Sequence, residues 1–297
     1  MRAFVFADKA LERYAGQFVW LAIDTENSAN ANFLTKYPIN VWPTLMIIDP
    51  KKESVALRYA GGATVPQLVK LLGDGQKVVR GANSKADAAI ARGDRRANEK
   101  KNTEAVAAYE EAIEAAPKNW SRFGRAAESL VFTLYASRDY DKCATEALRI
   151  YPRVKGTYSA ANVASEGLAC ASEKPENRAT FDALEKATRE TLDNPKIPLS
   201  GDDRSGMYDT LISAREALKD GDGAQKLRNE WATFLEGEAK KAKTAEQRAV
   251  YDSHRITAYI ALKQPERAIP MLEQSERDFP ADYNPPARLG LAYRTMG

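Results

Sequence analysis

The sequence predicts an α/β domain followed by an all-α array of helices. The first 75 residues alternate short apolar runs with amphipathic helical segments, whereas almost everything after residue 85 has helical periodicity and is rich in Ala, Glu, Lys and Arg. Between these parts, the stretch 73–84 holds three glycines in twelve residues and has mixed polarity, so we place a linker at 76–84. At 297 residues the chain exceeds the usual size of a single core, which also favours two domains, 1–75 and 85–297.

Six elements are expected in the N-terminal domain, because helical spacing, short apolar runs and Gly or Pro breaks follow one another closely. In chain order they are a helix at 3–14, a buried strand at 18–23, a helix at 27–37, strands at 44–48 and 54–59, and a helix that begins after Thr64. Thr64 is a residue type that caps helices, and Val65, Leu68, Val69 and Leu72 follow the 3.6-residue period.

The C-terminal region reads as consecutive helical hairpins. Residues 105–117, 140–152 and 265–280 each end a second helix at or near a proline, and 157–262 reads as helical pairs of irregular length. Residues 288–293 look like the start of one more first helix, with no partner helix after it in this sequence.

Charge and composition exclude several classes of partner. The net charge is only +3, and beyond residue 80 the chain has 34 basic against 34 acidic residues, which suits solvated helix faces rather than a nucleic-acid-binding surface. No apolar run approaches the roughly 20 residues of a transmembrane helix, and the first six residues do not form a signal peptide.

No catalytic or metal-binding constellation is found. Cys143 and Cys170, separated by 26 residues, are expected to be two small buried apolar side chains, with a bridge between neighbouring helices as the alternative. The single histidine, His254, is expected to be structural. We therefore predict no catalytic residue, no metal and no cofactor in this chain.

One set of residues has a recognisable spacing in the helical region. Gly93, Ala105, Tyr109, Ala112 and Pro117 stand at successive separations of 12, 4, 3 and 5. This spacing resembles the tetratricopeptide repeat, in which small residues lie where two helices touch, an aromatic ring fills the groove, and proline ends the second helix. The resemblance implies a surface that binds extended peptides or partner proteins. A purely structural extension or a dimerisation arm is the alternative.

A second resemblance rests on Trp42-Pro43-Thr44, which lies directly before an apolar strand. X-Pro is the peptide bond that takes the cis form at modest cost, and a cis bond is expected here. With residues 18–24, the hairpin after Asp49 and Tyr59-Ala-Gly-Gly62, this pattern resembles thioredoxin-like proteins over about 75 residues. The resemblance implies that Trp42, Pro43 and Thr44 offer backbone to an extended peptide. Alternatively, Trp42 packs and Pro43 only shapes a turn.

Two parts of that family's pattern are missing. One is the strand that lies in the centre of the family's sheet, between the strands matching 18–23 and 44–48. The other is the Cys-x-x-Cys pair that opens the helix matching 3–14. Without the strand, residues 18–23 are expected to have unpaired backbone groups and exposed apolar side chains. We therefore expect a fragment, or a reading frame begun at an internal Met, with a Cys-x-x-Cys just before Met1 in the parent protein.

Together the resemblances imply a thioredoxin-family parent, a thiol–disulfide oxidoreductase whose helical arm selects client proteins. Its chemistry would be thiolate attack on a disulfide, carried by cysteines that this chain lacks. The alternative is a non-enzymatic protein-binding or holdase module, and the presence of an upstream Cys-x-x-Cys distinguishes the two. The resemblance favours a bacterial periplasm or envelope location, with the cytoplasm as the alternative.

Overall fold

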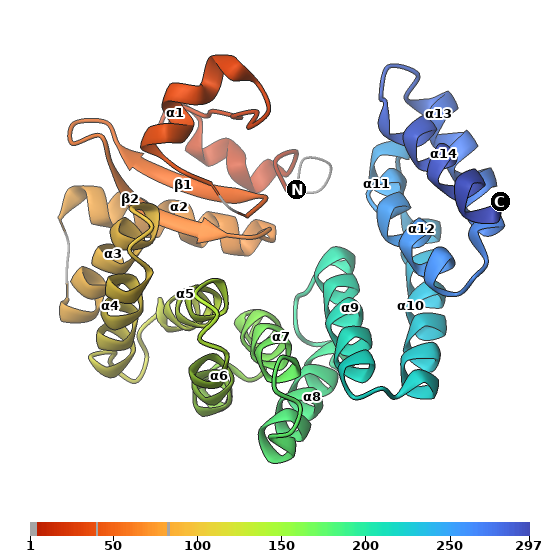
Figure 1. Ribbon diagram of the computed structural model, residues 1–297. Helices are drawn as coiled ribbons and strands as arrows, with labels where there is room; N and C mark the ends of the chain where they lie inside the picture. The colour runs from red at the N-terminus through yellow and green to blue at the C-terminus, as the bar shows by residue number, and fades with distance from the viewer. Residues whose placement is uncertain (1–4, 40, 82–83) are drawn as a thin grey trace. The chain divides into compact units, whose positions relative to one another are not determined.

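The computed structural model describes residues 5–39, 41–81 and 84–297, which form two compact units, Met1–Lys155 (unit 1) and Gly156–Gly297 (unit 2). In the described residues a two-stranded antiparallel sheet is followed by an all-α array of helices (Figure 1). The elements of unit 1 are η1 (Lys9–Tyr14), η2 (Ser28–Asn30), α1 (Ala31–Lys36), β1 (Thr44–Asp49), β2 (Ser54–Ala60), α2 (Val65–Arg80), α3 (Lys85–Asn98), α4 (Asn102–Glu114), α5 (Phe123–Ala136) and α6 (Tyr140–Val154). Those of unit 2 are α7 (Ser159–Ser172), α8 (Arg178–Asp193), α9 (Gly201–Ala217), α10 (Gly221–Lys241), α11 (Ala245–Ala249), α12 (Asp252–Ala261), η3 (Pro265–Ala268), α13 (Ile269–Asp278) and α14 (Asn284–Met296).

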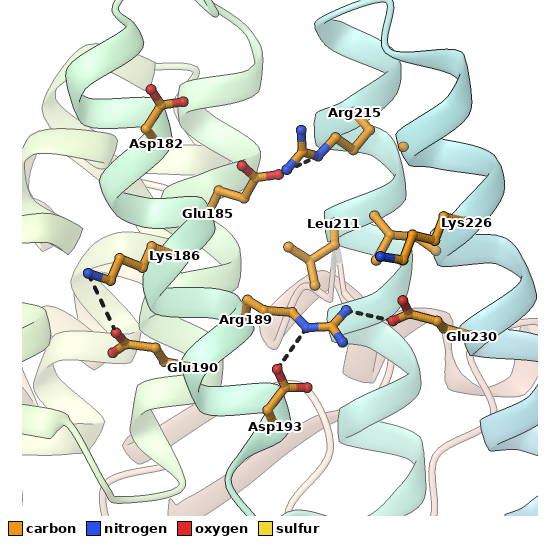
Figure 2. Close-up of a pocket in the computed structure, with 12 residues that line it drawn as sticks. Asp182, Glu185, Lys186, Arg189, Glu190, Asp193, Leu211, Arg215, Lys226 and Glu230 are labelled. Atoms are coloured by element: carbon orange, nitrogen blue, oxygen red, sulfur yellow. Dashed lines mark hydrogen bonds and ion pairs between the residues drawn. The ribbon is translucent and has the colours of Figure 1, made fainter.

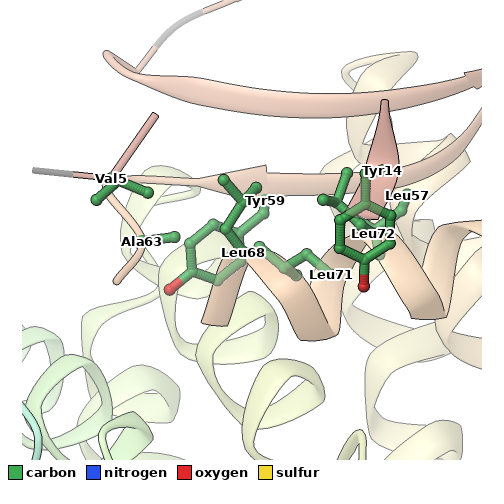
Figure 3. Packing of buried hydrophobic residues seen from close by; sticks show 8 residues of the cluster. All are labelled: Val5, Tyr14, Leu57, Tyr59, Ala63, Leu68, Leu71 and Leu72. Carbon is green, nitrogen blue, oxygen red and sulfur yellow. The ribbon is translucent and has the colours of Figure 1, made fainter. Parts of the chain in front are cut away.

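The sheet packs one face on α2. β1 pairs with β2 from Thr44↔Ala60 to Asp49↔Ser54, with an irregularity after Ile47. Side chains of the hairpin, α2 and the N-terminal turns form a buried apolar cluster (Figure 3), whose members are Val5, Tyr14, Leu57, Tyr59, Ala63, Leu68, Leu71 and Leu72. Apolar residues at alternate strand positions and at helical spacing meet in this cluster, as the sequence pattern predicts.

Most of the expected N-terminal elements are confirmed, and one is wrong. Strands form at 44–49 and 54–60, and α2 begins after Thr64, whose backbone N–H donates to Gln67 Oε1 at 2.7 Å. The helix expected at 3–14 is a 3-10 helix at 9–14, and its positions 3 and 4 lie outside the described residues. Residues 18–23 do not form a strand, because no described strand pairs with them.

The segment 76–84 differs from the expected linker. Gln76 to Arg80 are helical, because α2 continues its apolar stripe past the glycines and ends at Gly81 with φ +81°. Residues 82 and 83 lie outside the described part of the chain. The linker also does not separate the two compact units, since unit 1 includes the helices up to α6. The predicted division into two domains, 1–75 and 85–297, therefore stays a prediction.

The helical hairpins share one turn geometry. In four of them the first helix ends at a basic residue in the left-handed region, with φ between 58° and 60°. These residues are Lys100, Arg138, Lys219 and Lys263. The N–H of the following residue then donates back to the carbonyl five residues earlier, as in Lys101 N→Arg96 O at 2.9 Å and Asp220 N→Arg215 O at 2.9 Å. A repeated helix end of this kind marks the array as built from similar hairpins in both units.

The residues predicted to pack the first hairpin are brought together. Ala105, Tyr109 and Ala112 on α4 are buried against α3, and the Tyr109 ring lies directly on Gly93. A Cβ atom at Gly93 would stand 2.4 Å from Tyr109 Cε1, so only glycine fits there without a shift. Pro117 is exposed and follows the end of α4.

A buried network of charges joins the sheet and α2 to the first helices of the array. Arg125 Nη1 donates to Asp94 Oδ2 at 2.7 Å, and the Tyr109 hydroxyl donates to Asp94 Oδ1 at 3.0 Å. Burial works to lower the pKa of Arg125, but Asp94 outweighs it and the pKa is raised. The β2 residue Arg58 is buried close to the same two groups, Tyr109 and Asp94, and burial lowers its pKa.

A second ion pair extends this network to α2. Arg122, at the start of α5, places Nε 3.0 Å from Asp74 Oδ1 on α2 and Nη1 3.0 Å from Asp87 Oδ1 on α3. Trp120 Nε1 donates to the same Asp87 oxygen at 2.9 Å. One guanidinium therefore links three helices on both sides of the expected linker.

The close contact at Gly93 yields a stability prediction. Gly93→Ala should lower the free energy of unfolding by about 1–3 kcal/mol, because the added methyl collides with the buried Tyr109 ring. Gly206→Ala in α9 is the control, since nothing lies within 4 Å of a Cβ there, and it should be neutral or stabilising by up to about 1 kcal/mol. Urea unfolding followed by circular dichroism measures both, and equal midpoints for the two variants would contradict the packing described.

The buried charge network yields a second stability prediction. Arg125→Met leaves Asp94 buried with the Tyr109 hydroxyl as its remaining donor, and should cost about 3–5 kcal/mol of unfolding free energy. The control is Arg149→Met, whose pair with Glu146 has an arginine side chain 50% exposed and should change stability by less than about 1 kcal/mol. The double variant Arg125→Met, Asp94→Leu should recover part of the loss. Additive losses in the double variant would show that Asp94 and Arg125 do not stabilise unit 1 as a pair.

Candidate functional site

The outer edge of β1 carries backbone groups with which no other described strand pairs. The Gly61 N–H donates to Pro43 O at 2.8 Å, which makes Pro43 and Gly61 a hydrogen-bonded position of the β1–β2 ladder. In an antiparallel pair such positions alternate, so the N–H and C=O of Thr44 and Met46 point away from β2. No other described strand pairs with β1. Thr44 and Met46 therefore present hydrogen-bonding groups to any strand that approaches.

Residues 18–24 lie outside the described helices and strands and carry exposed apolar side chains. Val19, Trp20 and Leu21 are 88%, 47% and 68% exposed. The segment begins at Phe18, whose ring lies 6.0 Å from that of Tyr14 in the apolar cluster. No backbone N–H between residues 18 and 24 donates to another described residue. This was expected from the missing neighbour strand, but the sequence alone did not show which side chains would be exposed.

Trp42, Pro43 and Thr44 connect the segment to the edge. The Trp42–Pro43 bond is cis, as predicted. The Trp42 indole is 65% exposed and its Nε1 donates to Thr25 Oγ1 at 3.0 Å, just beyond residues 18–24. The Thr44 hydroxyl donates to Val41 O at 2.6 Å. The role of these three residues in peptide binding stays a prediction.

The arrangement favours an extended polypeptide as ligand. A strand laid along β1 can pair its backbone with Thr44 and Met46 while its apolar side chains cover Trp20, Leu21 and Trp42. β1 also lacks the features that usually protect an edge: its single charged residue, Asp49, is buried at the strand end, and its irregularity adds a residue to β2 rather than to β1.

The cysteines are placed where sequence reasoning expected them, but in another redox state. Cys143 on α6 and Cys170 on α7 are buried, and both are disulfide-bonded. The prediction of burial is confirmed, whereas the prediction of two unlinked apolar side chains is wrong. A buried disulfide-bonded sulfur cannot act as the exposed thiolate that thiol–disulfide exchange requires.

Among the described residues, no group of three or more His, Cys, Asp or Glu side chains is arranged to hold a metal ion. His254 Nε2 lies 2.9 Å from Asp202 Oδ1, and this hydrogen bond lowers the pKa of Asp202. No described helix has the length and apolar character needed to span a bilayer.

Unit 2 has a groove of about 660 Å³ between α8, α9 and α10 (Figure 2). Leu211 and Leu227 are among its lining residues, and charged side chains dominate the rest. Arg189 spans from α8 to Glu230 on α10 at 2.7 Å, and Arg215 on α9 lies 2.7 Å from Glu185 on α8. Because these guanidinium groups are already paired within the groove, they tie the three helices together rather than select a charged ligand. Charged residues at helical spacing over 182–193 were the sequence signal for this face.

Comparison with known proteins adds no assignment: no protein-family model matches the chain, and no curated protein matches it.

Proposed function

We propose that this chain is a polypeptide-binding protein with a thioredoxin-like N-terminal part and a tetratricopeptide-like helical array. Its ligand is an extended apolar segment of a client protein that adds to the open edge of β1. Two observations carry the proposal: no described strand pairs with the outward backbone groups of Thr44 and Met46, and the side chains of Trp20, Leu21 and Trp42 are exposed. The thioredoxin-like resemblance supports it independently, since in that family the residues matching Trp42–Thr44 face extended peptides.

Burial of apolar area supplies the binding energy. Tryptophan side chains bury about 150–250 Å² each when fully covered, so Trp20 and Trp42, at 47% and 65% exposure, retain roughly 170–280 Å² together. At about 25 cal/mol per Å², covering this area would contribute on the order of 4–7 kcal/mol before the cost of ordering the client. The backbone pairs with Thr44 and Met46 set the register, and a polar client would gain little from the same surface.

Binding rather than catalysis is proposed for these 297 residues. Thiol–disulfide oxidoreductase chemistry, the function of the resembled family, needs a low-pKa thiolate, and both cysteines here are buried and disulfide-bonded. If a parent protein carries a reactive cysteine pair elsewhere, the β1 edge is where its client would be held.

The proposed compartment is the bacterial periplasm or envelope. Disulfide-bonded cysteines persist in oxidising compartments and are rare in the cytosol, which supports this location. The helical array is proposed to contribute partner selection, because consecutive hairpins present a long surface with few internal constraints on its outer side chains.

The strand-addition proposal is tested by a pair of substitutions at one position. Met46→Pro removes an outward N–H without touching the β1–β2 ladder, whereas Met46→Ala removes the same side chain and keeps the N–H. A fluorescein-labelled peptide of alternating Val and Thr should bind the wild type and Met46→Ala alike, and Met46→Pro at least tenfold more weakly, about 1.4 kcal/mol.

Fluorescence anisotropy measures the affinities, and circular dichroism checks that both variants fold. Trp20 and Trp42 should also become less accessible to acrylamide when the peptide binds. Equal affinities of Met46→Pro and Met46→Ala would reject strand addition. If the wild type binds a Lys/Asp-substituted peptide as tightly as the apolar peptide, the apolar preference is rejected.

A further inference from the structure

The first turn of α9 lies against both α10 and the start of α12. A Cβ atom at Gly201 would stand 2.6 Å from the Tyr251 hydroxyl oxygen and 2.9 Å from Glu238 Oε2, so a side chain at this position would collide with both groups. At the next residue, Asp202 Oδ1 lies 2.9 Å from His254 Nε2. A hydroxyl and a carboxylate therefore converge on the first turn of α9, beside a second carboxylate.

The Tyr251 side chain points its hydroxyl into this place without a partner. Tyr251 is only 6% exposed, and no group in the part of the chain that the structure describes forms a hydrogen bond with its hydroxyl. Burial, followed by the charges of Glu238 and Asp202, raises the pKa of Tyr251 to about 12, so the hydroxyl keeps its proton at neutral pH. A buried tyrosine hydroxyl usually has a hydrogen-bond partner, which indicates that a ligand group completes this one.

The two oxygens are spaced for one bridging donor. The Tyr251 hydroxyl and Glu238 Oε2 lie 2.6 and 2.9 Å from the same point, so they are at most 5.5 Å apart. A nitrogen between them can lie at about 2.8 Å from each, which is hydrogen-bond distance. Glu238 Oε1 already accepts from Lys241 Nζ at 2.7 Å, which leaves Oε2 for a second donor.

The charges around this point favour a cationic donor over a neutral one. Asp202 is ionised at neutral pH, because its hydrogen bond with His254 lowers its pKa. Asp202 and Asp203, both in the first turn, more than offset the positive end of the α9 dipole. Glu238 adds another negative charge, and its partner Lys241 has a side chain that is 74% exposed, so solvent screens that ion pair.

We propose that Glu238, Tyr251 and Asp202 form a binding site for a primary ammonium group, carried by a lysine side chain or by a small amine. The nitrogen donates to Glu238 Oε2 and to the Tyr251 hydroxyl oxygen, and the charge of Asp202 attracts it. The site lies entirely within unit 2 and does not involve the β1 edge, so it goes beyond the function proposed above.

The single histidine of the chain reports on this site. Because His254 is hydrogen-bonded to Asp202, its ring proton resonances should shift when n-butylammonium chloride is added to the full chain at constant pH and ionic strength. The shift should saturate with a Kd on the order of 1–10 mM. Tetramethylammonium chloride has the same charge and no N–H, and should bind at least about tenfold more weakly.

The same titration distinguishes the two sources of the ammonium group. Tighter binding of Nα-acetyl-lysine amide than of n-butylammonium would identify a polypeptide lysine as the ligand. Equal or weaker binding would identify a small amine.

Four variants test which groups hold the ligand. Glu238→Gln and Tyr251→Phe should each weaken n-butylammonium binding about tenfold, because each alters one acceptor of the nitrogen. Glu216→Gln and Tyr208→Phe make the same chemical changes further along α9 and should bind like the wild type. Circular dichroism checks that all four fold. The proposal is overturned if n-butylammonium shifts the His254 resonances no more than tetramethylammonium does, or if either site variant binds like its control.

Discussion

Unit 1 depends on one buried carboxylate, Asp94. It is fully buried on α3, and it takes hydrogen bonds from Arg125 on α5 at 2.7 Å and from the Tyr109 hydroxyl on α4 at 3.0 Å. Arg58 of β2 lies close enough to interact electrostatically with the Asp94 carboxylate. Leaving this buried carboxylate without its donors would cost several kcal/mol of unfolding free energy. The network therefore favours the observed arrangement of α3, α4, α5 and β2.

This network explains how a sheet with only two described strands is stable. A two-stranded hairpin is marginal in water, and it needs a packed face to be stable. One side of β2 packs on α2 through Leu57 and Tyr59, and Arg58 points from the other side toward Asp94. β2 is thus covered on both faces, whereas no described strand pairs with the outer edge of β1. The proposed client site is therefore an open edge on a rigid support, which favours binding without a large ordering cost.

The extent of agreement between sequence and structure follows from the range of the interactions involved. Helical and strand periodicity, the Thr64 start of α2, the cis bond before Pro43 and the contact of Gly93 with Tyr109 all leave a local signal, and each is present. The strand expected at 18–23 is absent, because a strand forms only with a neighbouring strand, which can lie far away in sequence. The glycines at 73, 75 and 81 made the stretch up to residue 84 look like a linker, yet residues 76–80 belong to α2, whose Asp74 pairs with Arg122, more than forty residues away.

The candidate site shows the same division. Trp42, Pro43 and Thr44 could be singled out from the sequence, since a proline before an apolar strand is unusual. The exposed Val19, Trp20 and Leu21 could not be identified as a surface, because an apolar run of this length normally predicts burial. Likewise, the disulfide bonding of Cys143 and Cys170 depends on tertiary placement, which spacing alone does not determine.

Amide hydrogen exchange at β1, resolved by NMR, tests the central claim most directly. In the free protein, the amides of Leu45 and Ile47 should exchange slowly because they face β2, and those of Thr44 and Met46 should exchange fast because they face the open edge. Adding an extended apolar peptide should slow Thr44 and Met46 selectively. Slow exchange of both amides in the free protein, or fast exchange while the peptide is bound, would contradict strand addition at this edge.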